Sequence, residues 1–250
     1  MGVGISPSID HSGKPTIFHV THWKAGSQWV YSLLKAAAPD RIVAGKDSPA
    51  WFFKEPIVAG GIYTPVYATH QQFRRVVPEE CNQRTFALIR DARDSAVSWY
   101  FSLLYSHRTE YDTVIQTRQA LKNIDQREGM TLIFQNYVRD LVEIQRSWLE
   151  SGMKIFRYED LLADQHGVFR QILEHCEIDV PERRQRSIIN RCCFRRKTWW
   201  RFGRENVKSH YRKGVVGDWK NHFDPELKQR FKNLYADSLI RAGYERDSEW

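Results

Sequence analysis

The chain has 250 residues, of which 42% are hydrophobic and 13% aromatic, so it can bury a substantial core and is not a disordered chain. Lysine and arginine outnumber aspartate and glutamate by 38 to 30, and the net charge of +8 favours an anionic partner. No stretch approaches the ~20 apolar residues that a membrane-spanning helix needs. These numbers leave nucleic acid, an acidic membrane or a phosphorylated small molecule as the partner.

The first part of the chain alternates strand and helix signals after a Gly-, Ser- and Pro-rich lead-in over residues 1–15. Residues 16–21 (TIFHVT) predict a short buried strand, because they are rich in β-branched side chains. Residues 27–38 predict a helix that Pro39 stops, and 41–44 a weak second strand.

The stretch 45–82 holds several prolines and glycines and is expected to be mostly loop. Residues 85–90 (TFALIR) predict a strand, and 94–105 have the apolar spacing of a helix. The remaining expected elements are a long helix at 131–151, a strand at 154–156 and helices near 165–177 and 225–242. This alternation predicts one α/β domain over residues 1–250, with a mainly parallel central sheet flanked by helices.

The cysteines give a further expectation about the cellular compartment. Cys81, Cys176, Cys192 and Cys193 include no Cys-x-x-Cys pair, which excludes zinc-ribbon and thioredoxin-like sites. We interpret them as free thiols in a reducing compartment and find no signal peptide, so a cytoplasmic location is expected.

The turn between the first strand and the first helix, residues 22–29 (HWKAGSQW), has the composition of an anion site. A helix N-terminus offers free N–H groups and a partial positive charge. Lys24 adds a full charge, Gly26 allows a close backbone approach, and Ser27 can cap the helix. The phosphate loop of nucleotide triphosphatases is a poor match, because no Gly-Lys-Ser or Gly-Lys-Thr occurs. Taken alone, this segment is equally compatible with a plain strand–turn–helix junction.

Two further segments favour the anion site. Residues 90–98 (RDARDSAVS) again follow a strand and open a helix, so Arg90 and Ser98 can converge on one anionic group. Residues 212–220 (RKGVVGDWK) supply two adjacent cations, and Gly214 frees backbone N–H groups to face a phosphate.

Together these segments resemble the cytosolic type of sulfotransferase, which uses 3′-phosphoadenosine-5′-phosphosulfate (PAPS). The first motif of that family, roughly Y-P-K-S-G-T-T-W, is similar here at Lys24, Gly26 and Trp29. The second, roughly R-[DN]-P-[RK]-D-x-x-V-S, is similar to residues 90–98 except that alanine replaces the proline. The third, R-K-G-x-x-G-D-W-K-N, is similar to residues 212–221 without a gap.

The resemblance implies a phosphate-binding strand–loop–helix and the transfer of a sulfuryl group from PAPS to a hydroxyl or amine of a small-molecule acceptor, with the bisphosphate PAP as product. The residues that it places on the cofactor are Lys24, Gly26, Ser27 and Gln28 at the 5′-phosphate and sulfuryl group, Arg90, Ser98, Arg212, Lys213 and Gly214 at the 3′-phosphate, and Trp29, Phe194 and Tyr158 at the adenine. Plain packing stays open for the three rings, and a salt bridge with Asp94 or Glu159 stays open for Arg90. The basic, aromatic-rich residues 183–213 are expected to be a mobile or ligand-ordered loop that covers the cofactor.

Sulfuryl transfer needs a base for the acceptor proton and a cation for the charge that develops on the departing phosphate oxygen. Lys24 suits the second role. Residues 68–78 (ATHQQFRRVVP) resemble the K-T-H-L-P segment that carries the family's catalytic histidine, which implies His70 as the base. The competing histidines are His19, His22 and His107. No metal is expected, because the cations supply the charge.

Several positions depart from the family pattern. Gln28 replaces a hydroxyl, and Ala68 replaces a lysine that would add a cation near the sulfuryl group. Asp224, Pro225 and Gln229 depart from a short dimer segment, so a monomer or weak homodimer is expected. The aromatic content of residues 51–67 and 99–111 indicates an apolar acceptor pocket.

Two other functions remain as alternatives. A nucleotide-dependent phosphotransferase predicts a glycine-lysine-hydroxyl loop, which is absent, and a magnesium-binding carboxylate, which we cannot identify. A nucleic-acid-binding protein would account for the charge of +8 and the basic-aromatic stretch, but gives no reason for the ordered motifs. We therefore expect neither nucleic acid nor a membrane as partner.

Overall fold

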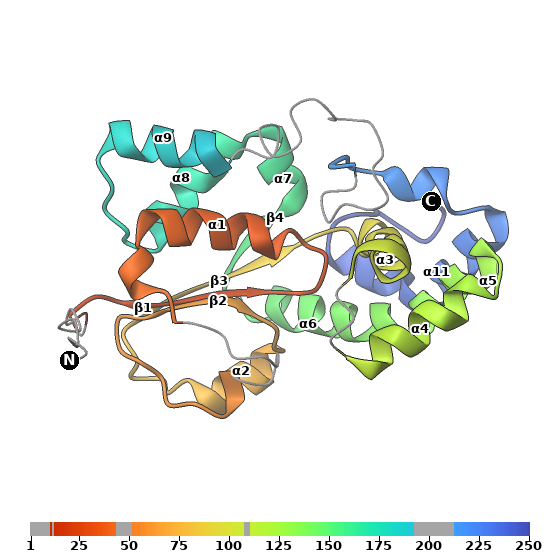
Figure 1. The fold of residues 1–250 in the computed structure, drawn as a ribbon, viewed down its shortest axis with the longest axis horizontal. Coiled ribbons are helices and arrows are strands. Elements are labelled where there is room, and N and C mark those ends of the chain that lie inside the picture. Colours follow the sequence, from red (N-terminus) through yellow and green to blue (C-terminus); the bar gives the residue numbers. More distant parts are fainter. Residues whose placement is uncertain (1–10, 12, 44–51, 108–110, 193–212) are drawn as a thin grey trace, which may run out of the picture.

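The computed structural model describes residues 11, 13–43, 52–107, 111–192 and 213–250 (Figure 1). Within them a four-stranded sheet has the order β2-β1-β3-β4 and is parallel throughout. Its strands are β1 (Thr16–Thr21), β2 (Ile62–Val66), β3 (Gln83–Ile89) and β4 (Lys154–Arg157). Every residue of β1 is buried, as expected of a parallel strand covered on both faces. The predicted α/β fold with a parallel central sheet is confirmed.

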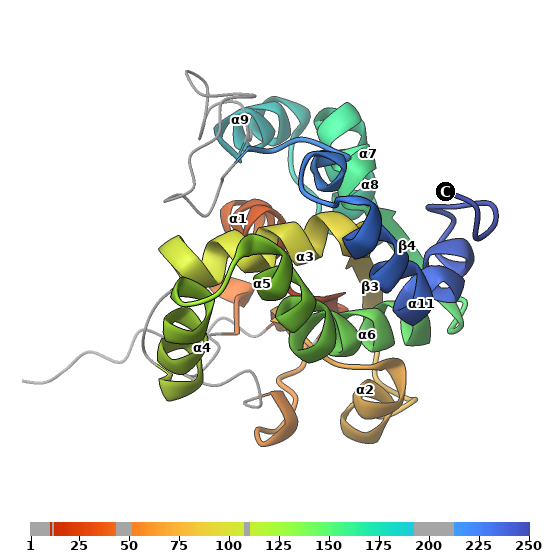
Figure 2. The same ribbon diagram turned by 90° about the vertical axis from the view of Figure 1, so that its right-hand side faces the viewer.

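Helices cover both faces of the sheet (Figures 1 and 2). One face carries α1 (Ser27–Ala37), α7 (Tyr158–Ala163), α8 (Gln165–His175) and α9 (Glu182–Cys192), which share one apolar core with the sheet. The other face carries α2 (His70–Val76) and α6 (Arg139–Leu149). A third core joins α3 (Ala92–Phe101), α4 (Asp112–Lys122), α5 (Gln126–Ile133) and α11 (Pro225–Arg241). None of the helices among the described residues combines the length and the apolar character that a membrane crossing requires.

The strands predicted at 16–21, 85–90 and 154–156 are confirmed, as are the helices at 27–38, 165–177 and 225–242. The long helix expected at 131–151 is interrupted, because a π-helical turn, η4 (Phe134–Val138), joins α5 to α6. A second π-helical turn, η3 (Ser102–Ser106), extends α3 to the end of the predicted 94–105 helix.

The second strand was predicted at the wrong place. Residues Pro39–Arg41 form a short 3-10 helix, η1, and Ile42 makes a single bridge to Ile62. The second strand of the chain is β2, which lies inside the stretch expected to be loop and pairs with one edge of β1. The helix α2 follows it. Pro65 obscured β2 in the sequence, and the fold tolerates this proline because β2 lies at the edge of the sheet.

The prediction of a loop over residues 183–213 is also wrong for the first part of that stretch. Residues Glu182–Cys192 form α9, because Ile188, Ile189 and Cys192 lie on one face that packs against α1 while the arginines face solvent. Residues 193–212, which include the predicted cofactor residues Phe194 and Arg212, lie outside the described part of the chain.

Candidate active site

A cavity of about 750 Å³ lies at the carboxyl edge of the sheet, where β1 and β3 end. Side chains line it from the segments that follow all four strands, and from α3 and η3. The lining residues are Trp23, Lys24, Gly26, Ser27, Gln28, Trp29, Tyr67, Arg90, Ser98, Trp99, Ser106, His107 and Tyr158. The structure therefore brings together all the predicted residues of the first turn with Arg90, Ser98 and Tyr158. The carboxyl edge of a parallel sheet is the usual place for a ligand site in an α/β fold.

The first turn presents the N-terminus of α1 to this cavity. Lys24 and Gly26 both adopt left-handed backbone angles, with φ of 67° and 92°. Gly26 is the N-cap of α1, which has no side-chain cap and no acidic residue in its first turn. The positive end of the helix is therefore available to an anion. The expectation that Ser27 caps α1 is wrong, because its hydroxyl instead bonds the hydroxyl of Tyr67 at 3.1 Å.

Gly26 is also the residue against which Tyr158 packs. A Cβ added at Gly26 would lie 2.8 Å from Cδ2 of Tyr158, so any side chain here would displace that ring. Trp29 is 2% exposed, and its indole N–H donates to the carbonyl of Cys192 at 2.8 Å. The packing role that the sequence left open for Trp29 is therefore present, although the residue also borders the cavity.

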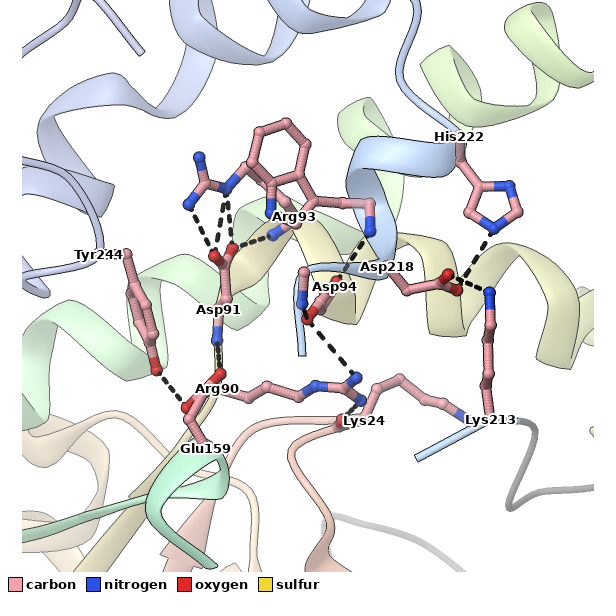
Figure 3. A network of polar contacts seen from close by, with 12 residues as sticks. Lys24, Arg90, Asp91, Arg93, Asp94, Glu159, Lys213, Asp218, His222 and Tyr244 are labelled. Carbon is pink, nitrogen blue, oxygen red and sulfur yellow. Dashed lines mark hydrogen bonds and ion pairs between the residues drawn. The ribbon is translucent and has the colours of Figure 1, made fainter. Parts of the chain in front are cut away.

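Arg90 ties the turn to the end of β3 (Figure 3). Its guanidinium donates to the carbonyl of Lys24 at 3.1 Å, lies 4.2 Å from the ring centroid of Tyr158, and is 3.9 Å from the carboxylate of Asp94. The salt bridge between Arg90 and Asp94, which the sequence left open, is therefore present in the structure. Glu159 instead accepts a hydrogen bond from the backbone N–H of Asp91.

Asp94 connects α3 to the third sequence motif. Its carboxylate accepts hydrogen bonds from the backbone N–H groups of Gly217 and Trp219, at 2.8 and 3.0 Å. Burial raises the pKa of Asp94, and Arg90 and the two N–H donors act in the opposite direction. The second and third motifs are thus held together by one buried carboxylate.

The described part of the third motif, residues 213–221, does not line the cavity. Lys213 donates to Asp218 at 2.6 Å, in the short helix η5 (Asp218–Asn221), and His222 lies 3.3 Å from the same carboxylate (Figure 3). Gly214 has a left-handed φ of 64°. Of the predicted 3′-phosphate residues, Arg90 and Ser98 line the cavity, whereas Lys213 and Gly214 do not.

A family model described as the sulfotransferase domain matches residues 14–243. The chain belongs to the sulfotransferase family. Cytosolic sulfotransferase 3 of Arabidopsis thaliana is 22% identical over 240 residues, which cover 86% of this chain and 74% of the relative. The 3-alpha-hydroxysteroid sulfotransferase of Cavia porcellus is 24% identical over 258 residues, or 90% and 83% of the two chains.

The solved structures agree on the fold. Mouse sulfotransferase SULT7A1, crystallised with PAP, matches with a TM-score of 0.65 at 18% identity, covering 94% of this chain and 90% of that one. A retinol dehydratase crystallised with androsterone and PAP matches with a TM-score of 0.52 at 14% identity, covering 93% and 84%. The sequence-based prediction of a sulfotransferase is confirmed.

The histidine predicted as the base of the sulfotransferase lies at the same edge of the sheet but not in the cavity lining. His70 is the first residue of α2, which Thr69 caps, and its ring centroid is 5.1 Å from that of Trp148. Burial lowers the pKa of His70, and the nearby Arg74 lowers it further. Among the described residues, the histidine that lines the cavity is His107, whose ring centroid lies 5.3 Å from that of Trp99.

The other two competing histidines are built into the fold. His22 donates from Nδ1 to the carbonyl of Trp23 at 2.9 Å and accepts at Nε2 from the backbone N–H of Arg90 at 3.1 Å. It therefore joins the first turn to the end of β3. His19 is fully buried, bonds the Thr64 hydroxyl at 2.8 Å and stacks on Phe86. Burial lowers the pKa of His22 to about 4 and that of His19 to about 3.

These two histidines predict an acid-sensitive fold. Both are neutral in the folded protein and become protonated near pH 6.5 when it unfolds, so stability should fall as the pH drops from 6.5 toward 4. Each contributes up to about 1.4 kcal/mol per pH unit in that window. In urea titrations across it, His19→Phe should lose less stability than the unaltered protein, by roughly this amount per pH unit. Equal slopes for the two proteins would show that His19 does not titrate on unfolding.

The sequence did not single out Trp23, Tyr67, Trp99 or Ser106 as site residues. It indicated an aromatic acceptor pocket from 51–67 and 99–111, and Tyr67 and Trp99 fall in those stretches. Tyr67 directly follows β2, so a correct prediction of that strand would have placed it at the carboxyl edge. Trp23, Trp99 and Ser106 lie in stretches that the sequence did indicate, but no local signal singles out each residue within its stretch.

Proposed function

We propose that this sulfotransferase transfers the sulfuryl group of PAPS to a hydroxyl or amine of a small-molecule acceptor. The observation that carries the proposal is one cavity that combines the uncapped N-terminus of α1 with Lys24 and Arg90. This set of donors fits a ligand with more than one phosphate, because each is a strong partner for anionic oxygens. PAPS, when bound, supplies an activated sulfuryl group and a phosphate leaving group.

The roles that we propose for the phosphate ligands come from the family resemblance, and the cavity lining supports those of Lys24, Arg90 and Ser98. Lys24 stabilises the charge that develops on the departing phosphate oxygen, together with the backbone at Gly26, Ser27 and Gln28. Arg90 and Ser98 bind the 3′-phosphate. Its remaining partners are Arg212, Lys213 and Gly214, and the rings that border the adenine are Trp29, Tyr158 and Phe194. For this role the Lys213 ammonium group has to leave Asp218 or to donate to Asp218 and the phosphate at the same time.

The base that we propose is His70. Its lowered pKa supports the role, because a neutral imidazole at pH 7 can accept the proton of the acceptor. Its place at the start of α2, in the connection that follows β2, also supports it, since β2 is the neighbour of β1 and both strands end at the edge that holds Lys24.

A matched pair of variants tests this base. His70→Ala should lower kcat by about 100-fold or more with little change in PAP affinity. His107→Ala, at the histidine of the cavity lining, should act mainly on the KM of the acceptor. Steady-state kinetics and PAP binding separate the two effects. Full activity of His70→Ala beside an inactive His107→Ala would transfer the role to His107.

The acceptor and the setting are supported by relatives. A relative named for 3-alpha-hydroxysteroids supports a small hydroxylated acceptor, and relatives named as cytosolic support a cytoplasmic location. A monomer or weak homodimer is supported by Asp224, which caps α11 and pairs with Arg127 of the same chain.

The decisive experiment for the proposed function is calorimetry with PAP, AMP and ATP in the absence of magnesium. The protein should bind PAP at least about 100-fold more tightly than AMP, because only PAP carries the 3′-phosphate. Equal affinities, or binding of ATP that requires magnesium, would overturn the proposal and favour a phosphotransferase.

A further inference from the structure

Two hydroxyl groups form a pair in the lining of the cavity. Tyr67 directly follows β2, and Ser27 opens α1 just after the turn that follows β1. Their oxygens lie 3.1 Å apart, and both residues line the cavity. Because β1 and β2 are neighbours, the pair bridges the carboxyl ends of two adjacent strands.

This pair of hydroxyls has one O–H donor that is not used in the hydrogen bond between them. Two hydroxyls carry two protons, and the hydrogen bond between them uses one. Neither hydroxyl has another partner among the described residues. Burial raises the pKa of Tyr67, against the opposite effect of the Ser27 bond, so the phenol is neutral and keeps its proton at pH 7. The pair therefore presents one O–H donor to whatever fills the cavity.

The position of Tyr67 is fixed from two sides. Its ring stacks on that of Trp23, with centroids 5.0 Å apart and an interplanar angle of 4°. On the other side the carbonyl of Ala68 accepts a hydrogen bond from the indole of Trp148 at 2.8 Å, which holds the backbone next to Tyr67. Trp23 directly precedes Lys24 and Ser27 follows it by three residues, so both contacts of Tyr67 flank the residue that carries the ammonium group. A donor that is fixed before the reaction orients its partner without a further loss of freedom.

We propose that Tyr67 is a further catalytic residue, whose hydroxyl pair with Ser27 donates a hydrogen bond to the sulfuryl oxygens during transfer. This inference rests on the proposed function. In the transfer the acceptor oxygen or nitrogen forms a new bond to sulfur, the bond from sulfur to the phosphate oxygen breaks, and the acceptor proton goes to the base. The electron pair of the broken bond leaves with PAP. A neutral O–H donor in a fixed position holds the sulfuryl group in line between the acceptor and the leaving phosphate, without taking part in proton transfer.

The test uses the fact that PAP lacks the sulfuryl group. Tyr67→Phe should slow the formation of PAP from PAPS by at least about tenfold, because the Ser27 hydroxyl that remains loses the partner that fixes its direction, and it should leave the Kd for PAP within a factor of about two. The rate of PAP formation is measured with 2-naphthol as the probe acceptor. If 2-naphthol is not a substrate, the rate is measured with water as the acceptor. Tyr31→Phe is the control, because Tyr31 lies on α1 but does not line the cavity. It should behave as the unaltered protein.

A second variant tests the pair as a unit. Ser27→Ala combined with Tyr67→Phe should be slower than either single variant, because each single variant keeps one hydroxyl with a free proton and only the double variant removes both. A Tyr67→Phe rate close to that of the unaltered protein would overturn the inference. So would a loss of PAP affinity equal to the loss of rate, since that result indicates a purely structural role. Failure of the unaltered protein to bind PAP would overturn the proposed function itself, and the inference with it.

Discussion

Lys24→Met should reduce the turnover of PAPS by about 1,000-fold while leaving the fold intact. The loss is large because Lys24 supplies the full positive charge of the turn, next to the uncapped N-terminus of α1. The fold should tolerate the change, because the Lys24 side chain is only partly buried and packs over the ring of Trp99, with the ammonium 5.6 Å from the ring centroid. Methionine keeps most of the apolar length of the lysine side chain.

The measurement is kcat/KM for PAPS together with the free energy of unfolding of each variant. The chain offers a matched control in Lys35→Met, because Lys35 also lies over an aromatic ring, that of Tyr31 at 5.5 Å, but outside the cavity. This control should keep full activity. If Lys24→Met retained more than about a tenth of the activity, Lys24 would not stabilise the departing phosphate.

Arg90→Met should lower both PAP affinity and stability. Arg90 is 9% exposed, and its guanidinium compensates the carboxylate of Asp94, a residue that is 2% exposed. Breaking a buried ion pair typically costs 3–5 kcal/mol, and we expect about 3 because two backbone N–H groups continue to stabilise Asp94. PAP affinity should fall at least about 100-fold, because a charged donor to the 3′-phosphate is lost.

A double variant separates these two effects. Arg90→Met with Asp94→Asn removes the uncompensated carboxylate, so it should recover part of the lost free energy of unfolding without recovering PAP affinity. Urea denaturation and calorimetry with PAP provide the two measurements. If affinity returned together with stability, Arg90 would act only through the fold and not on the phosphate.

Local patterns in the sequence were sufficient where one segment carries both the element and the chemistry. The strand at 16–21, the turn at Lys24 and Gly26, and the strand that ends at Arg90 are contiguous segments. Each combines a buried strand with a polar turn that opens a helix, and parallel strands bring such turns to one edge of the sheet. The fold class and many of the residues that line the cavity therefore followed from the sequence alone.

Only the tertiary structure decided the features that depend on distant partners. Pro65 weakens the local signal of β2, which forms because the edge of β1 is available to pair with it. The arginine-rich α9 is a helix because its few apolar side chains meet α1. His22 was a candidate base in the sequence, but in the structure both of its ring nitrogens are hydrogen-bonded to the backbone. Tyr67 became a candidate only through its hydrogen bond to Ser27. Burial and hydrogen bonding between segments far apart in the chain set these outcomes, and no local spacing encodes them.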